Sequence, residues 1–253
     1  MTLLKAEGVT MDFGGVRAVD HVDLTVEQGH ILGIIGPNGS GKTTFFNVLT
    51  GIYRPTSGRF SFQGQDIVGW SSHRITQIGI ARTFQNIRLF RNMSVLENVL
   101  VGEHTKLKAT LWGALLRTPG ERQGEATARK KAEELLRFVD LFDKADEFAA
   151  NLAYGEQRRL ELARSLASQP MLLLLDEPTA GMNPSEASRI MELIHAIRDL
   201  GVTIVLIEHN MQVMMGTAEW IVALDAGAKI AEGTPKDIQY NEKVIQAYLG
   251  EEE

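Results

Sequence analysis

Residues 36–44 combine three glycines with a lysine and two threonines, in the order Gly-Pro-Asn-Gly-Ser-Gly-Lys-Thr-Thr. This spacing matches the pattern G-x-x-x-x-G-K-[ST] of a phosphate-binding loop, in which main-chain N–H groups surround a series of phosphates. In such a loop Lys42 reaches the β- and γ-phosphates from an exposed strand end, and the Thr43 hydroxyl ligates Mg²⁺. The pattern therefore predicts a nucleotide site whose candidate contacts are Gly36, Asn38, Gly39, Ser40, Gly41, Lys42, Thr43 and Thr44.

The residues on either side of this loop predict a strand before it and a helix after it. Residues 30–35 are apolar and rich in isoleucine, as in a strand that is buried on both faces, whereas residues 44–50 favour a helix ending near Gly51. The positive end of a helix dipole helps to bind an anion. This context favours a phosphate loop over the alternative, a glycine-rich turn that binds nothing.

Two further apolar runs end in polar residues. Residues 171–175 lead into Asp176 and Glu177, and residues 202–207 lead into Glu208 and His209. Ligands of open α/β sheets bind beyond the carboxyl ends of the strands, so these two ends and the phosphate loop are expected to meet at one site.

Together these residues predict phosphoryl transfer to water, which needs a metal, charge neutralisation and a group that orients the water. Asp176 is expected to hold Mg²⁺ with Thr43, directly or through water, which leaves Glu177 to polarise the attacking water. His209 is a candidate for holding the γ-phosphate or positioning Glu177. Gln85, at the end of a short predicted strand, is a candidate ligand of the metal or water. The alternatives are that His209 has a structural role and that Gln85 is a solvated loop residue.

Composition limits the remaining function classes. The protein has 253 residues, 44% of them hydrophobic, which is normal for a soluble globular protein. It has no cysteine, so it offers neither thiol chemistry nor cysteine-based zinc sites, and a cytoplasmic setting is expected. The formal charge of −6 argues against a nucleic-acid-binding surface. No apolar run is long enough to span a bilayer, so a membrane role would require a partner.

The sequence is expected to form an α/β protein of two lobes. Residues 1–93 begin with two strand-like runs, 3–13 and 18–26, separated by Gly14 and Gly15, which predicts an antiparallel hairpin whose first strand ends at Phe13. Residues 94–168 lack strand signals and predict an inserted α-helical subdomain, while residues 169–253 complete the nucleotide-binding core. Within the subdomain, residues 111–116 form an apolar patch, interpreted as internal packing or as a contact with a membrane or partner.

The full set of motifs, in this order and spacing, resembles the ATP-binding subunits of ATP-binding-cassette (ABC) transporters. Gln85 stands at the position of the family's Q-loop glutamine, and His209 at that of its switch histidine. The resemblance implies that Phe13 stacks on adenine. It also implies that residues 152–157 are the signature motif, which in a head-to-tail dimer contacts the partner's ATP through Ala153, Tyr154, Gly155 and Glu156.

Several stretches that are less specific than the ATPase motifs resemble the larger ATPase subunit of branched-chain amino-acid importers. They are residues 82–85, 88–90, 115–119 and 247–250, together with the variant signature. This resemblance implies an ATPase that uses ATP and Mg²⁺ at the cytoplasmic face of the cell membrane. Its partners would be permease subunits, a second ATPase subunit, identical or paralogous, and indirectly a periplasmic or extracellular solute-binding protein.

Other hypotheses and two departures from the family pattern qualify this resemblance. A lipopolysaccharide-export ATPase shares the general motifs, a phosphate-loop nucleotide kinase shares the loop, and a soluble family member would act on DNA or ribosomes. Ala153 replaces the usual signature serine, and Asn183 replaces the usual D-loop aspartate. A hydroxyl contact at 153 and a carboxylate role at 183 therefore do not carry over.

Overall fold

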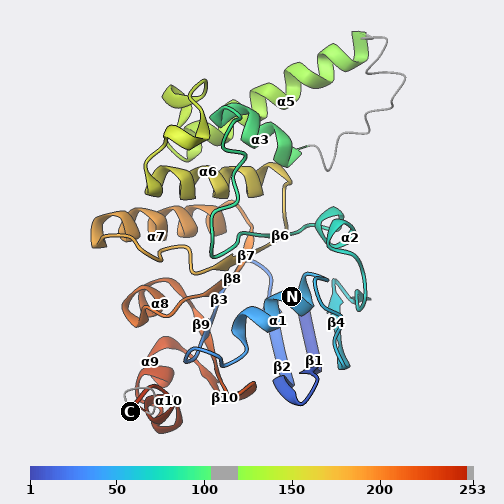
Figure 1. The fold of residues 1–253 in the computed structure, drawn as a ribbon, viewed down its shortest axis with the longest axis vertical. Helices are drawn as coiled ribbons and strands as arrows, with labels where there is room; N and C mark the ends of the chain where they lie inside the picture. The colour runs from blue at the N-terminus through green and yellow to red at the C-terminus, as the bar shows by residue number, and fades with distance from the viewer. Residues whose placement is uncertain (104–118, 250–253) are drawn as a thin grey trace. The chain divides into compact units, whose positions relative to one another are not determined.

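The computed structural model describes residues 1–103 and 119–249, which belong to two compact units (Figure 1). The first unit consists of Met1–Ile75 and Met171–Glu253, and the second of Thr76–Pro170. The second unit contains the predicted helical block and also residues 76–93, which include Gln85. The apolar patch at 111–116 lies outside the described residues.

The N-terminal sheet of the first unit has the strand order β2-β1-β4-β5. Its strands are β1 (Thr2–Phe13), β2 (Val16–Glu27), β4 (Ser57–Phe62) and β5 (Gln65–Asp66). The predicted hairpin is confirmed, because β1 pairs antiparallel with β2 and Phe13 lies opposite Val16. Gly14 takes a positive φ of 59° in the connecting turn, which glycine adopts without steric cost.

The larger sheet positions the nucleotide site, and within the first unit its strand order is β10-β9-β3-β8-β7. The strands are β3 (Ile31–Ile35), β7 (Leu172–Asp176), β8 (Thr203–Ile207), β9 (Trp220–Asp225) and β10 (Ala228–Gly233). β3, β8 and β7 are parallel neighbours, and every residue in them is buried. Their carboxyl ends therefore share one edge, as the apolar runs predict.

The helices of the first unit begin with strong local signals. They are α1 (Lys42–Leu49), α7 (Pro184–Asp199), α8 (Met211–Thr217), α9 (Pro235–Gln239) and α10 (Glu242–Leu249), while α2 (Ser72–Gln77) spans the unit boundary. Asn183 caps α7: its side chain accepts the Glu186 N–H (2.9 Å), and the Glu186 carboxylate accepts the Asn183 N–H (3.1 Å). The departure at position 183 thus keeps a residue that caps a helix well.

The second unit is mainly helical. It contains β6 (Ile80–Arg82), α3 (Val95–Glu103), α5 (Pro119–Phe138), α6 (Tyr154–Ala167) and 3-10 turns at Phe142–Lys144 and Ala149–Asn151. α6 packs against both α3 and α5 (Figure 1). Pro119 begins α5, where its fixed φ suits a first turn.

α6 begins at Tyr154, within the candidate signature motif at 152–157. The extended backbone of Ala153 (ψ 156°) leads into the helix before the apolar spacing starts.

No helix in residues 1–103 and 119–249 is long and apolar enough to cross a membrane.

Candidate nucleotide-binding site

The predicted phosphate loop connects β3 to α1 with very little space around two of its glycines. A Cβ added at Gly36 would lie 2.1 Å from the main-chain oxygen of Leu224, and one added at Gly41 would lie 2.3 Å from that of Ala18. Gly41 also caps α1 with φ 95°. These two positions therefore need glycine both for their backbone conformation and because neighbouring main chain leaves no room for a side chain.

Lys42 lies folded over its own loop. Its Nζ donates hydrogen bonds to the main-chain oxygens of Gly36 (2.6 Å) and Pro37 (2.7 Å), and it also contacts Ser40 Oγ (3.2 Å). The expectation of an exposed lysine is wrong, because these contacts leave the residue only 7% exposed. Thr43, by contrast, is exposed in the first turn of α1.

The end of β7 presents two carboxylates in different surroundings. Asp176 is buried at the last position of the strand, whereas Glu177 follows in a left-handed conformation with φ 48°. The Glu177 N–H still donates to the main-chain oxygen of Ile207 in β8 (2.9 Å). The backbone thus leaves the strand immediately after the last parallel hydrogen bond, and such strained conformations concentrate at functional sites.

Glu177 and His209 are brought together, as the neighbouring strand ends predict. Glu177 Oε2 lies 3.6 Å from His209 Nδ1, a distance suited to an ion pair if the imidazole is protonated. The Glu177 side chain is 16% exposed and that of His209 is 58% exposed. A water molecule therefore has access to the imidazole and restricted access to the carboxylate.

Glu208, to which the sequence assigned no role, lies at the end of β8 and is completely buried. Its Oε1 accepts hydrogen bonds from both the main-chain N–H (3.0 Å) and the hydroxyl (2.6 Å) of Thr179. Oε2 has no hydrogen-bond partner among the described residues, and burial raises the pKa of the carboxyl group. Glu208 therefore fixes the turn that carries Glu177. In the sequence, the signal that could have identified Glu208 is a charged residue directly after an apolar strand.

The adenine-stacking candidate Phe13 is exposed at the end of β1 and packs against a second aromatic residue. Its ring centre lies 5.1 Å from that of Tyr53, and the rings are nearly perpendicular at 81°. Edge-to-face contact of this kind stabilises an aromatic pair. Tyr53, which was not predicted from the sequence, thus supports the ring of Phe13, and both residues remain partly exposed.

The oxygen donors at this edge fit Mg²⁺. Thr43 offers an exposed hydroxyl after β3, and Asp176 offers a buried carboxylate at the end of β7, with β8 between the two strands. Magnesium is held in nucleotide sites by one or two protein oxygens together with phosphate oxygens and water. No cluster of three or more acidic or histidine side chains that could hold a metal ion is found in residues 1–103 and 119–249.

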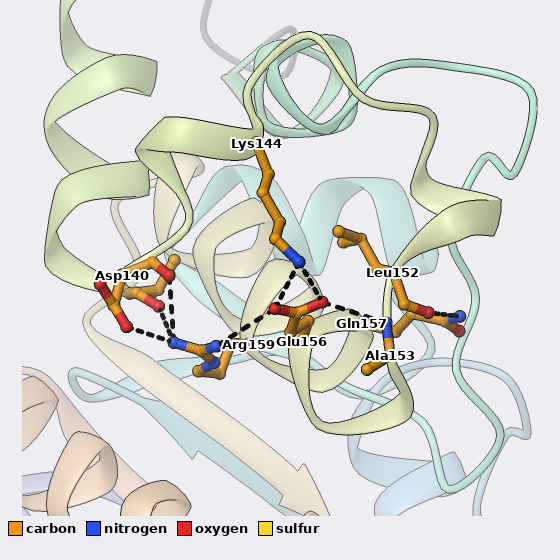
Figure 2. A network of polar contacts seen from close by, with 8 residues as sticks. Asp140, Lys144, Leu152, Ala153, Glu156, Gln157 and Arg159 are labelled. Atoms are coloured by element: carbon orange, nitrogen blue, oxygen red, sulfur yellow. Dashed lines mark hydrogen bonds and ion pairs between the residues drawn. The ribbon is translucent and has the colours of Figure 1, made fainter.

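In the second unit, the signature segment is organised by Glu156 (Figure 2). Glu156 Oε2 accepts the N–H of Ala153 (3.1 Å), while Lys144 Nζ donates to both carboxylate oxygens (2.8 and 3.0 Å). Arg159 Nη2 lies 3.9 Å from Glu156 Oε1, and Arg159 Nη1 donates a hydrogen bond to the main-chain oxygen of Asp140 (3.1 Å). The hydrogen bond from Lys144 lowers the pKa of Glu156, so the carboxylate is ionised and neutralised within its own unit.

This arrangement is half of a capping box. Because Ala153 has no side-chain oxygen, it offers no acceptor to the α6 amides, and only the reciprocal bond from Ala153 N–H to Glu156 forms. Ala153 and Tyr154 are exposed, and Gly155 is half-buried in the first turn. The start of α6 therefore offers main-chain N–H groups to a ligand and no side-chain hydroxyl from position 153.

The second unit also exposes three large apolar side chains on neighbouring segments, Phe90, Met93 and Phe148, which we call the Phe90 patch. The segments that carry it are paired, because the Ala149 N–H donates to the main-chain oxygen of Met93 (3.0 Å). Buried Asn98 shapes the patch: its Oδ1 accepts the Phe90 N–H (2.9 Å), and its Nδ2 donates to the Phe90 oxygen (3.0 Å). Phe148 joins the patch only through this pairing, and the sequence pattern did not mark it.

The fold and these motifs define a nucleotide-binding cassette, and comparison with known proteins identifies its family. The ABC transporter family matches residues 19–180, and the branched-chain amino acid ATP-binding cassette transporter family matches residues 228–253. The protein belongs to the ABC transporter family. The predicted family, fold class and enzyme class, an ATPase that uses ATP, are confirmed.

Similar proteins match along almost the whole sequence. The protein is 46% identical over 250 residues to the high-affinity branched-chain amino acid transport ATP-binding protein LivG of Salmonella typhimurium, with 98% of each sequence covered. The lipopolysaccharide export system ATP-binding protein LptB of Haemophilus influenzae is 34% identical, with 100% of this sequence and 99% of LptB covered. The relative named for amino-acid transport is thus the more similar of the two.

Solved structures share the fold along nearly the full length. The ADP conformation of MJ1267, an ATP-binding cassette of an ABC transporter, has a TM-score of 0.86 and 31% identity, with 99% of each protein covered. The dimeric structure of MJ0796, a bacterial ABC transporter cassette, has a TM-score of 0.77 and 27% identity, with 92% of this protein and 99% of MJ0796 covered.

Proposed function

We propose that this protein is the ATP-hydrolysing subunit of a membrane transporter that imports branched-chain or related amino acids. The observation that carries the ATPase assignment is the placement of the phosphate loop, Asp176–Glu177 and His209 at the ends of neighbouring parallel strands. The solute class rests on the function for which LivG is named and on the C-terminal match over residues 228–253.

Each residue at the strand ends has a role in this proposal. The loop amides and Lys42 neutralise the phosphates, and Lys42 exchanges its contacts with loop oxygens for phosphate oxygens. Thr43 and Asp176 would hold Mg²⁺, and Gln85 would be an additional ligand of the metal or the water. When bound, the ion would offset the negative charge of the phosphates.

Glu177 is the proposed general base. Its carboxylate accepts a proton from the attacking water, and His209, 3.6 Å away, positions that carboxylate or contacts the γ-phosphate. Phe13, supported by Tyr53, stacks on the adenine. The left-handed backbone at Glu177 and the hydrogen bonds between Glu208 and Thr179 keep this carboxylate in place.

The signature segment completes the site of a second subunit, identical or paralogous, in a head-to-tail dimer. The contact to the partner's γ-phosphate comes from main-chain N–H groups near Gly155, with Ala153 and Tyr154 beside it. Glu156 contributes indirectly, because Lys144 neutralises it and it caps the segment. An uncompensated carboxylate in the first turn would repel the phosphate.

We further propose that the protein binds permease subunits at the cytoplasmic face of the cell membrane. The Phe90 patch, with Arg88 and Arg91 beside it, presents apolar and basic side chains that fit a helix of a membrane protein at its cytoplasmic end. A periplasmic or extracellular solute-binding protein would act on the permease and not on this subunit.

The central experiment compares the parent protein with Glu177→Gln in ATP hydrolysis and in size-exclusion chromatography with ATP. Glutamine keeps the size of the side chain but accepts no proton, so hydrolysis should fall by about 10² or more while an ATP-bound dimer accumulates. A variant that hydrolyses ATP at the parent rate would contradict the assigned base.

A second experiment addresses the solute. The protein is purified from membranes together with its bound permeases, reconstituted with the cognate binding protein, and tested for uptake of leucine and for export of lipopolysaccharide. Leucine uptake that requires ATP supports amino-acid import. Consumption of ATP in which the γ-phosphoryl group is transferred to a nucleotide acceptor, in place of water, would instead favour a kinase.

A further inference from the structure

The C-terminal helix reaches the first residue of the phosphate loop. The Tyr248 hydroxyl oxygen in α10 accepts a hydrogen bond from the main-chain N–H of Gly36 (2.9 Å), across 212 residues of sequence and within the first unit. Gly36 is buried, and a buried N–H group almost always has a partner in a native protein. The tyrosine supplies this partner at the point where β3 ends.

Gly36 is held on its other sides as well. Its carbonyl oxygen accepts a hydrogen bond from Lys42 Nζ (2.6 Å), and the space a side chain would occupy is filled by the Leu224 oxygen and Ser40 Oγ. The same residue thus connects Tyr248 on its N–H side to Lys42 on its carbonyl side. A shift of Gly36 moves an acceptor of the lysine that binds phosphate.

α10 is anchored well enough to act as a fixed support. Asn241 Oδ1 accepts the N–H groups of Lys243 (3.0 Å) and Val244 (3.3 Å) and caps the helix. Val244 is buried, and Tyr248 follows it by four residues, on the same face of the helix. α9 and α10 both pack on β10 (Figure 1).

We propose that Tyr248 is a positioning residue of the nucleotide site, through which the C-terminal segment sets the phosphate loop for ATP. The segment that matches the branched-chain amino acid family model then contributes directly to ATP binding. This inference rests on the proposed function only in requiring that the loop binds phosphates. By linkage, bound nucleotide and docked α10 stabilise one another to the same extent.

The test is Tyr248→Phe, which removes one oxygen atom, with Tyr240→Phe as the matched control because Tyr240 is 70% exposed in the same region. The Kd for ATP should rise about 3- to 10-fold in Tyr248→Phe, the loss expected for one neutral hydrogen bond. The kcat at saturating ATP should stay near the parent value, and the Gly36 amide should exchange with solvent faster. Tyr240→Phe should match the parent in all three measurements.

The alternatives give different results. If the hydroxyl only helps α10 to pack, Tyr248→Phe lowers the melting temperature while the ATP Kd stays at the parent value, which overturns the proposal. An unchanged Gly36 exchange rate overturns it as well. A parent protein that binds no ATP would overturn the proposed function itself, whereas normal parent binding with an unaffected Tyr248→Phe would refute only the role of Tyr248.

Discussion

Arg158 Nη2 donates a hydrogen bond to the main-chain oxygen of Gln85 (2.9 Å), which connects the signature helix to the candidate Q-loop within the second unit. The same guanidinium, through Nη1, binds the Phe84 oxygen (2.8 Å) and Glu161 Oε2 (2.8 Å), and it is completely buried. The main chain at Gln85 is therefore fixed to α6. A displacement of one requires a displacement of the other or the loss of charged hydrogen bonds.

The first prediction concerns this buried ion pair. Arg158→Met leaves Glu161 buried without its cation, so the free energy of unfolding should fall by about 3–5 kcal/mol. Burial raises the pKa of Glu161 and Arg158 opposes this rise, so removing the arginine should raise the pKa further. Urea unfolding of Arg158→Met and of Arg158→Met/Glu161→Leu should show that the double variant recovers most of the loss. Equal losses in the two variants would contradict an ionic pair.

The second prediction concerns Lys42. Lys42→Met keeps most of the side-chain stem but removes the charged group, so the ATP Kd should rise roughly 10- to 100-fold and hydrolysis should stop. The loop oxygens at Gly36 and Pro37 lose their donor, and a small drop in melting temperature is expected. Titration calorimetry measures binding, with Lys5→Met at an exposed ion pair as the control. Unchanged ATP affinity would remove the phosphate-loop assignment.

The third prediction separates two adjacent signature residues. Glu156→Gln keeps an oxygen for the Ala153 N–H, so ATP hydrolysis should remain within a few-fold of the parent. Gly155→Asp places a carboxylate beside the amides of the first turn, and it should abolish hydrolysis and ATP-driven dimerisation while ATP still binds the single subunit. Light scattering in the presence of ATP measures dimer formation. Normal hydrolysis by Gly155→Asp would refute the head-to-tail arrangement.

The fourth prediction concerns the Phe90 patch. Phe90→Ser and Phe148→Ser should each reduce co-purification with the permease and transport more than they reduce ATP hydrolysis by the isolated subunit, because both rings are exposed. Tyr240→Ser, which removes an exposed aromatic from the first unit, is the control. Equal loss of transport and of isolated ATPase activity would indicate a packing role instead.

The fifth prediction concerns pH and Glu208, whose pKa burial raises above its ordinary value of 4.5. Between that value and the raised pKa, the folded state binds more protons than the unfolded state, so the free energy of unfolding falls as pH increases. Glu208→Gln cannot ionise and should show a smaller fall as the pH rises from about 5 to about 8. Denaturant unfolding at both pH values measures this slope, with exposed Glu134→Gln as the control. Identical slopes in the parent and Glu208→Gln would show that Glu208 does not titrate there.

Local patterns in the sequence predicted much of the fold. Apolar runs placed β3, β7 and β8 almost to the residue, because strands buried on both faces leave a continuous signal. The start of α6 leaves no side-chain capping signal in the sequence, because Ala153 acts through its main-chain N–H. The start of α5 is ambiguous in the sequence, because proline suits a loop as well as a first helical turn.

The supporting contacts of the site were not predictable in this way. Tyr53 and Phe148 meet Phe13 and the Phe90 segment only through tertiary packing, and the contact between Tyr248 and Gly36 spans most of the sequence. The meeting of the β3, β8 and β7 carboxyl ends was predictable, because parallel strands end at the same edge of a sheet. No comparable rule connects a C-terminal tyrosine to a particular amide.

The hydrogen bonds of Lys42 to its own loop have a consequence for ligand choice. Any anion that takes this ammonium group must replace its bonds to the oxygens of Gly36, Pro37 and Ser40. In the proposed binding mode a triphosphate would contact Lys42 and several loop amides at once, whereas a single orthophosphate presents its oxygens over a short span. We therefore expect the loop to discriminate by the number of linked phosphates, which would reduce competition from free phosphate.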